Sequence, residues 1–198
     1  MNTFFAKETL PQGYAESEKI DLVKNKKQML LVNGLAVVLT IALIVLGIFI
    51  QPDGAAEIFD LKNHSLATAL KYMIIGVSTL AYIVGHEAVH GLFMWYFSRK
   101  KPNFGLSFTY AYAGSEVYFA KNAYLAIALA PVTLWGLLLG VVNLLIPAGW
   151  FWVVWFIQLI NISGAAGDLF VFVHMLRKPQ TVLVQDTGTA MTVYLPQD

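Results

Sequence analysis

Four long apolar segments, separated by short polar ones, dominate the pattern of this chain. They cover residues 29–50, 70–97, 123–146 and 150–173. Each has about the 20 mostly apolar residues that a helix needs to cross a bilayer. Pro147-Ala148-Gly149 predicts a short turn between the last two, and Trp150, Trp152 and Trp155 are typical of a membrane interface. The pattern therefore predicts an α-helical membrane protein with four transmembrane helices.

Two further segments alternate with a period of two, which is typical of β-strands. In residues 101–120 the alternating positions are aromatic or apolar, namely Phe104, Leu106, Phe108, Tyr110 and Tyr112. In residues 181–195, β-branched runs flank the turn sequence Asp186-Thr187-Gly188-Thr189. We expect a small cytoplasmic β-hairpin from each segment, and the two hairpins can share one sheet.

The distribution of basic residues predicts the orientation. Residues 1–28 are polar and lack the apolar run of a signal peptide, so we expect a cytoplasmic N-terminal segment followed by a single membrane-embedded domain at 29–198. Eleven of the thirteen Lys and Arg residues lie in segments 1–28, 98–122 and 174–198. By the positive-inside rule these segments face the cytoplasm. The expectation is a multi-pass protein of the cell membrane with both termini cytoplasmic.

Composition narrows the range of partners and ligands. Hydrophobic residues make up 58% of the chain and charged residues 13%, against roughly 45–50% and about 25% in soluble domains. The lipid bilayer is therefore the expected surrounding. A net charge of +1 offers no basic stripe for nucleic acid. Because the chain has no cysteine, any metal must be held by His, Asp, Glu or water.

One motif inside the second apolar segment carries candidate chemistry. His86-Glu87-Ala88-Val89-His90 has the form H-E-x-x-H. Histidines at i and i+4 share a helix face and can bind one zinc ion (Zn2+), while the adjacent glutamate can act as general base on a metal-bound water. The alternative is a pair of polar residues that are hydrogen-bonded in the core of a helix bundle. Titratable residues inside a span usually have a function, which favours the metal site.

A catalytic zinc site needs a third protein ligand from another helix. Asp168 is the only acidic residue in the third and fourth apolar segments, and its depth overlaps with that of His86 and His90. A metal would also neutralise a carboxylate that is costly in the membrane. The sequence therefore predicts Asp168 as the third ligand, with a salt bridge to Arg177 or Lys178 as the alternative.

The residues before Asp168 indicate how its helix can approach the helix that carries the histidines. Residues 163–167 are all small, which lets helices approach closely. Asn161 lies seven residues before Asp168 and projects from nearly the same helix face. Its amide can bind a substrate carbonyl or the oxyanion, or it can form a hydrogen bond between helices. His174, His64 and Glu116 are weaker candidates, as an interfacial histidine, a residue on the opposite side of the membrane and a solvated surface charge.

These residues resemble a family of small bacterial membrane proteins that are grouped under a domain of unknown function and described as zincin-type peptidases. The resemblance covers about residues 70–195. The residues that carry it are the H-E-x-x-H motif, Tyr110-Ala111-Tyr112-Ala113, Ala130-Pro131, Asn161 and residues 163–168. It implies a membrane fold and a peptidase reaction.

More distantly, the layout is similar to that of the site-two proteases, which are intramembrane metalloproteases. They have H-E-x-x-H in one helix and an aspartate ligand in a later helix, in an Asn-Pro-Asp-Gly sequence. Here no proline lies between Asn161 and Asp168, and Leu169 replaces the glycine. The departure affects the substrate-handling role that the similarity would assign to Asn161.

The sequence thus predicts a zinc-dependent intramembrane or membrane-proximal peptidase. Glu87 is the expected base, His86, His90 and Asp168 are the expected zinc ligands, and Asn161 is the expected substrate-binding residue. The expected substrate is a membrane-anchored protein or peptide, which can add as a strand to the edge of the 101–120 hairpin. The alternative is a non-catalytic metal-binding membrane protein with a structural or signalling role. A metal transporter is less favoured, because the sequence offers a single ligand cluster.

Overall fold

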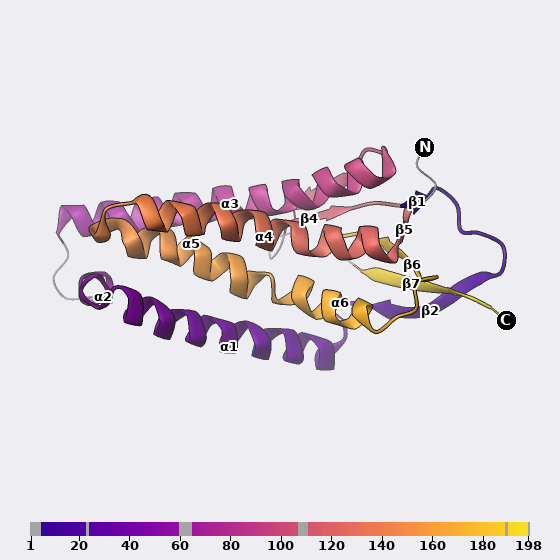
Figure 1. Ribbon diagram of the computed structural model, residues 1–198, viewed down its shortest axis with the longest axis horizontal. Coiled ribbons are helices and arrows are strands. Elements are labelled where there is room, and N and C mark those ends of the chain that lie inside the picture. Colours follow the sequence, from indigo (N-terminus) through magenta and orange to yellow (C-terminus); the bar gives the residue numbers. More distant parts are fainter. Residues whose placement is uncertain (1–4, 23, 60–64, 107–110, 189, 198) are drawn as a thin grey trace. The chain divides into compact units, whose positions relative to one another are not determined.

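A computed structural model describes all residues except 1–4, 23, 60–64, 107–110, 189 and 198. The helices are α1 (Lys26–Ile50), α2 (Pro52–Phe59), α3 (Leu66–Ser98), α4 (Lys121–Leu145), α5 (Phe151–Gly164) and α6 (Ala166–Leu176), with a 3-10 turn η1 (Ala148–Trp150) before α5 (Figure 1). The strands are β1 (Ala6–Lys7), β2 (Tyr14–Ile20), β3 (Asn103–Leu106), β4 (Ala111–Gly114), β5 (Tyr118–Ala120), β6 (Leu183–Asp186) and β7 (Met191–Pro196).

Three helices among the described residues are long and apolar enough to cross a membrane. They are α1, α3 and α4; α1 and α3 contain the first two predicted spans, and α4 covers the third except for its last residue, Ile146. The fourth predicted span, residues 150–173, is not one continuous helix, because α5 and α6 are separated by a break at Ala165 and are bent by 40° there. Gly164 and Gly167 flank the break, and glycine is among the least favourable residues inside a helix. Taken together, α5 and α6 form a fourth candidate span.

The chain divides into two compact units. The first, here called the sheet unit, consists of Met1–Val32, Gly85–Pro131 and Gly167–Asp198. The second, the helical unit, consists of Asn33–Val84 and Val132–Ala166. The whole H-E-x-x-H motif and Asp168 belong to the sheet unit, whereas Asn161 belongs to the helical unit.

The sheet unit contains a five-stranded antiparallel sheet in the order β1-β5-β6-β7-β2. Its core includes Phe119, Val184 and Val193, which pack with Met175 of α6. The β6–β7 hairpin matches the prediction for residues 181–195. The strands of the N-terminal segment were not predicted, because β2 reads Tyr-Ala-Glu-Ser-Glu-Lys-Ile and shows no apolar alternation. A charged strand of this kind suits the edge of a sheet.

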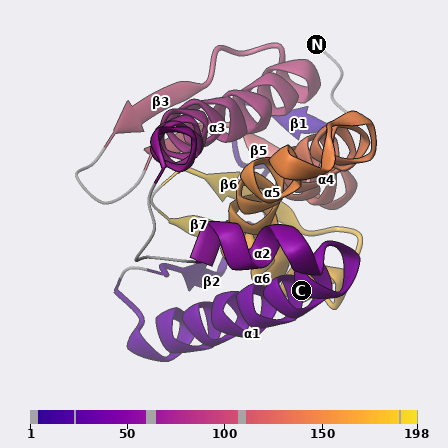
Figure 2. The same cartoon turned by 90° about the vertical axis from the view of Figure 1, so that its left-hand side faces the viewer.

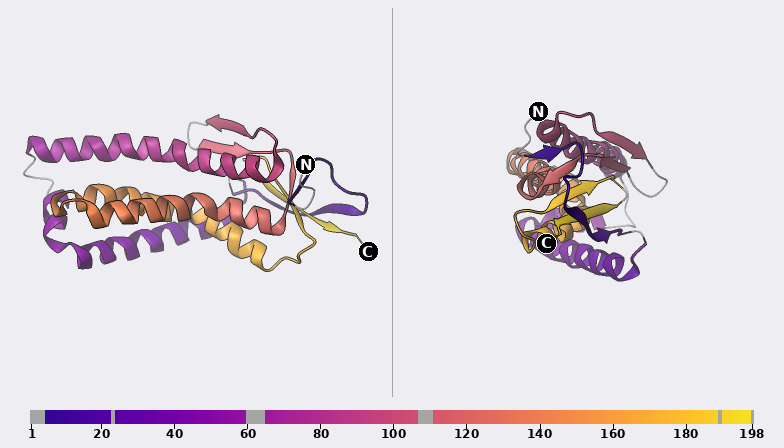
Figure 3. Two further views of the ribbon diagram at one scale, coloured as in Figure 1. Left: turned by 45° about the horizontal axis from the view of Figure 1, so that its top comes forward. Right: turned by 90° about the vertical axis from the view of Figure 1, so that its right-hand side faces the viewer.

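The predicted hairpin at residues 101–120 divides between two sheets. β3 and β4 form a separate antiparallel pair, while β5 joins the larger sheet beside β6. β3 lies beside α3 (Figure 3). The Phe104 ring of β3 occupies the space that a Cβ on Gly91 of α3 would take. Phe108 and Tyr110 of the predicted alternation lie outside the described residues.

A buried lysine fixes the C-terminal end of α6. Lys121, the first residue of α4, donates from Nζ to the backbone oxygens of Leu176 at 3.0 Å and of Lys178 at 2.5 Å. The last carbonyls of a helix have no partner within the helix, and a cation is favourable at that end of the helix dipole. α6 is therefore tied to α4 at one end, and it carries Asp168 near the other.

In the helical unit, α1 and α2 pack against α5 through tryptophan (Figure 2). The indole Nε1 of Trp152 donates to the carbonyl of Gln51, and that of Trp155 donates to the carbonyl of Leu43. A side chain on Gly47 would collide with both rings. The predicted interfacial role is thus wrong for Trp152 and Trp155, which are buried; Trp150 is 37% exposed.

An ionic cluster joins β2 to the end of α6. The Glu18 carboxylate accepts hydrogen bonds from His174 Nε2 at 2.9 Å and from Lys178 Nζ at 2.6 Å. Partial burial alone would raise the pKa of Glu18, but the hydrogen bonds and positive charge of these partners outweigh it and hold the pKa below 4.5. Ionised Glu18 therefore stabilises the folded sheet unit.

We expect Glu18→Gln to lower stability at neutral pH by about 1 kcal/mol or less, as for other partly exposed ion pairs. The contribution of Glu18 is complete above its ordinary pKa of 4.5 and is lost as the pH falls through the lowered pKa of the folded state. Thermal unfolding in detergent from pH 7 to about pH 3 measures the difference between wild type and variant. A difference that persists or grows in acid would contradict this assignment.

Candidate metal centre

Two histidines on one face of α3 form the base of the site. His86 and His90 are one helical turn apart, and both are buried. Their ring centroids lie 4.9 Å apart with the planes at 75°. The i, i+4 spacing therefore brings the two imidazoles together, as the sequence predicted.

Asp168 reaches this pair from the first turn of α6. Its Oδ2 lies 3.2 Å from His86 Nε2, and its Oδ1 lies 3.5 Å from His90 Nε2. The alternative partner Lys178 binds Glu18 instead. The third predicted ligand is thus beside the first two, and the donor atoms of all three lie within 4.8 Å of one another.

The arrangement fits a zinc ion on two independent grounds. Two ligands about 2.1 Å from a tetrahedral ion are themselves roughly 3.4 Å apart, which agrees with the 3.2 Å and 3.5 Å between the carboxylate and the imidazole nitrogens. In addition, His90 Nδ1 lies 3.0 Å from the carbonyl oxygen of Ile127. A carbonyl can only accept, so Nδ1 carries a proton, and Nε2, which faces Asp168, is the ring nitrogen placed to bind a metal.

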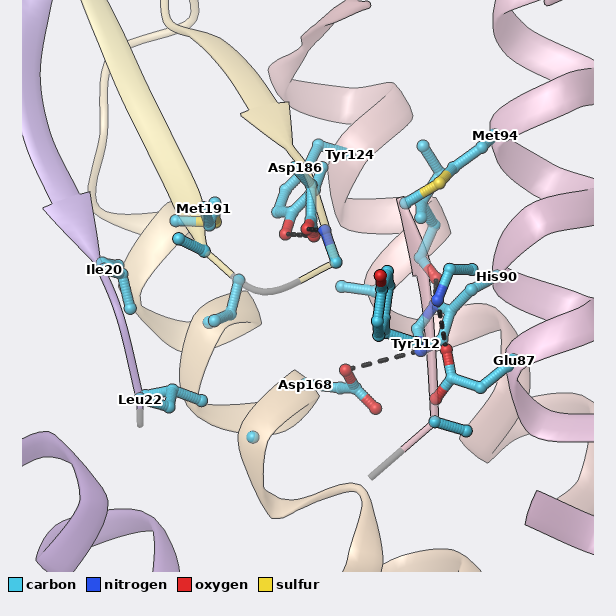
Figure 4. A pocket seen from close by; sticks show the side chains of 18 residues that line it. Ile20, Leu22, Glu87, His90, Met94, Tyr112, Tyr124, Asp168, Asp186 and Met191 are labelled. Carbon is cyan, nitrogen blue, oxygen red and sulfur yellow. Dashed lines mark hydrogen bonds and ion pairs between the residues drawn. The ribbon is translucent and has the colours of Figure 1, made fainter. Parts of the chain in front are cut away.

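Glu87 lies next to His86 in the chain and lines the same cavity as His90 and Asp168 (Figure 4). Its Oε2 accepts a hydrogen bond of 2.8 Å from the backbone N–H of Ala113 in β4. The strand thereby fixes the carboxylate of the predicted base. This contact could not be predicted from the sequence, because it depends on where β4 lies beside α3.

The cavity has a volume of about 350 Å³ and belongs wholly to the sheet unit. Its apolar wall is formed by Ile20, Leu22, Met94, Ile127, Val171 and Met191 (Figure 4). Such a lining, with a few polar groups, is typical of a site that binds an organic ligand. A peptide segment can therefore lie against the donor atoms of His90 and Asp168.

Tyr124 and Asp186 also line this cavity and were not predicted as site residues. The Tyr124 hydroxyl donates to Asp186 Oδ2 at 2.6 Å, and the Gly188 N–H donates to Asp186 Oδ1 at 2.8 Å. Burial raises the pKa of Asp186, although both hydrogen bonds oppose the shift. In the sequence, Asp186 carries only a turn signal, so no local pattern indicated that it faces a cavity.

Asn161 lies in the helical unit and is fully buried. Its Oδ1 accepts from the Tyr82 hydroxyl at 3.1 Å, and its Nδ2 donates to the Val132 carbonyl at 3.2 Å. The amide thus links α3, α4 and α5, which is the interhelical alternative considered for this residue. A role in substrate binding stays a prediction.

The remaining candidates lie elsewhere. His174 binds Glu18 at the end of α6. Glu116 is exposed between β4 and β5, as expected for a solvated charge. His64 lies outside the described residues.

Comparison with known proteins finds one family. A family model described as "Putative zincin peptidase" matches residues 79–183, more than half of the chain. The match includes the H-E-x-x-H motif and Asp168. No curated protein and no solved structure matches, so the similarity to site-two proteases stays a prediction.

Removing the Asp168 carboxylate tests the ligand set. Changing even a group that supports a metal ligand typically costs 10–100-fold in metal affinity, so we expect Asp168→Asn to weaken zinc binding by at least about 100-fold. The measurement is a chelator competition titration on the purified protein in detergent. Asp186→Asn is the matched control, because it removes a carboxylate from the same cavity but outside the triad, and it should bind zinc within a few-fold of wild type. Equal zinc affinity in Asp168→Asn and wild type would contradict the assignment.

Proposed function

The chain belongs to the family of putative zincin peptidases, and we propose that it is a zinc-dependent peptidase that acts within or beside the membrane. One observation carries the proposal. His86, His90 and Asp168 converge from two helices, and Glu87 lines the same cavity as His90 and Asp168. The H-E-x-x-H motif alone predicts two ligands and a base; the position of Asp168 supports a complete three-ligand site.

His86, His90 and Asp168 are the residues that would hold the zinc ion. A zinc ion bound there would lower the pKa of its water to about 7 and would polarise a carbonyl oxygen. Among the described residues, the group of side chains that could hold the ion consists of these three. Three protein ligands with a further position free is the pattern of catalytic zinc, whereas structural zinc is closed by four protein ligands. This favours the peptidase over a non-catalytic metal-binding protein.

Glu87 is the proposed general base. The Ala113 N–H occupies Oε2 and holds the carboxylate in place. The other oxygen can take a proton from the attacking water, and Glu87 then passes this proton to the leaving amine. Glu87 takes up and releases the proton with the same carboxylate. The proposed step therefore depends on where this carboxylate lies in the cavity.

The proposed substrate is a membrane-anchored protein or peptide in an extended conformation. A helix hides its peptide bonds, whereas a strand exposes them and can gain backbone hydrogen bonds from a sheet edge. The cavity is lined by residues 111–113 of β4 as well as by Glu87 and His90. This supports a path for an extended substrate along the β3–β4 pair to the metal ligands.

The pairing of strands supports a topology with four crossings. β2 pairs with β7, and β5 pairs with β6, so the segment before α1, the segment after α3 and the segment after α6 share one sheet. A sheet of this kind lies on one side of a membrane, because open sheet edges are not tolerated in lipid. α1 and α3 then make two crossings, and α4 with the α5–α6 pair makes two more. Together with the positive-inside rule, this supports cytoplasmic placement of the sheet and of both termini.

Replacing Glu87 with glutamine tests catalysis separately from metal binding. We expect Glu87→Gln to bind zinc normally and to cleave a membrane-anchored peptide about 10²–10⁴-fold more slowly, the usual contribution of a general base. Activity is measured in nanodiscs with zinc, after removal of the metal by chelator, and after zinc is restored.

Glu116→Gln is the matched control, because Glu116 is an exposed glutamate outside the cavity. It should keep wild-type activity. Cleavage by Glu87→Gln at the wild-type rate would exclude the proposed mechanism. Tight zinc binding by a wild-type protein that cleaves no membrane-anchored peptide would favour the non-catalytic alternative.

A further inference from the structure

The C-terminal end of α3 has an unusual backbone conformation. Arg99 follows the helix with φ of 58°, and among the described residues it is the only non-glycine residue with positive φ. Glycine is preferred where a helix ends in this left-handed conformation, since a side chain there is strained. The need to end the helix therefore does not explain why this position is an arginine.

Neighbouring hydrogen bonds hold Arg99 in this conformation. Its N–H donates to the Trp95 carbonyl at 2.7 Å. Ser98 Oγ donates to the Met94 carbonyl at 2.7 Å and accepts from the Lys100 N–H at 3.1 Å. These hydrogen bonds hold the backbone at the end of α3 in place, and with it the position from which the Arg99 side chain starts.

The Arg99 guanidinium lies against two exposed aromatic rings. Its Cζ is 5.4 Å from the centre of the Trp95 ring and 5.3 Å from that of Tyr96. These side chains are 45% and 57% exposed. The stacking uses the π faces, while the N–H donors lie in the plane of the guanidinium and can form two parallel hydrogen bonds to an oxyanion.

No acidic side chain among the described residues neutralises Arg99. Its neighbour Lys100 pairs with Glu8 at 3.1 Å, and Lys101 is exposed. The end of α3 therefore combines a fixed guanidinium, a second free cation and two aromatic rings. These groups lie at the end of an apolar helix that is long enough to span a membrane.

We propose that Arg99, Trp95 and Tyr96 form a binding site for the phosphate of an anionic phospholipid headgroup. Tryptophan and tyrosine favour the level of the headgroups, where their rings face both apolar and polar surroundings. Arginine matches phosphate with paired N–H donors, which lysine cannot do. The proposed cytoplasmic placement puts the site on the leaflet that carries anionic lipid. The site differs from the metal centre in its residues and its chemistry, so it does not depend on the peptidase proposal.

Native mass spectrometry of the full chain in detergent measures the site directly. Phosphatidylglycerol and phosphatidylcholine are titrated separately, and the dissociation constant of the first bound lipid is determined for each. We expect the wild type to prefer phosphatidylglycerol and Arg99→Gly to weaken its binding by at least about fivefold, the effect of one surface charge. Arg99→Lys keeps the charge but loses the paired donors, so it should also bind less tightly than wild type.

Two controls separate this site from general charge attraction and from misfolding. Lys101→Gln removes an adjacent exposed cation that makes no cation–π contact among the described residues, and it should change the dissociation constant less than Arg99→Gly does. Because glycine suits the left-handed conformation, Arg99→Gly should unfold at the same temperature as wild type or a higher one, even as lipid binding falls. Inorganic phosphate at millimolar concentration should not displace the lipid.

Three results of the lipid titrations would overturn the proposal. They are unchanged phosphatidylglycerol binding by Arg99→Gly, equal binding of the two lipids by the wild type, and an equal loss in Lys101→Gln and Arg99→Gly. Displacement by inorganic phosphate alone would show a phosphate site that does not need lipid, which also contradicts it.

Discussion

The contact of Asp168 with two histidines is the interaction on which the functional part of this structure depends. A carboxylate in an apolar setting is costly, by roughly 2.5–3.5 kcal/mol at the centre of a membrane helix. Here its two oxygens each face an imidazole nitrogen from α3. The break at Ala165 places Asp168 in the first turn of a new helix, where the helix dipole favours a negative charge. Lys121 and the Glu18 cluster hold the other end of the same helix. α6 is therefore held at both ends, with the Asp168 carboxylate facing the two histidines.

The five-stranded sheet imposes a second constraint, because it joins segments that are separated by the long apolar helices. β2 comes before α1, β5 comes between α3 and α4, and β6 and β7 follow α6. The proposed topology rests on this pairing, because the sheet brings together segments that come before, between and after the long helices. The same sheet supplies Met191 and Asp186 to the cavity beside His90. The strands that support the proposed topology therefore also supply residues that line the cavity.

The features that could be predicted from the sequence are those with a local pattern. The three long apolar helices follow from hydropathy, and His86, Glu87 and His90 follow from spacing on one helix face. Asp168 followed from a different argument, namely that a lone acid deep in an apolar segment needs a partner. What was missed depends on tertiary packing. The polar β2 forms only because β7 offers an edge, and Trp152 and Trp155 are buried because Gly47 leaves room for them. Tyr124 and Asp186 meet in the cavity through contacts 62 residues apart in the chain.

The most direct test of the metal centre is X-ray absorption spectroscopy at the zinc edge of the zinc-loaded wild-type protein in detergent. The structure predicts one ion per chain with two imidazole ligands and oxygen ligands at about 2.0–2.2 Å, one of the oxygens coming from Asp168. The absence of imidazole scattering, or a signal from only one imidazole, would contradict the central claim that His86, His90 and Asp168 together hold the metal.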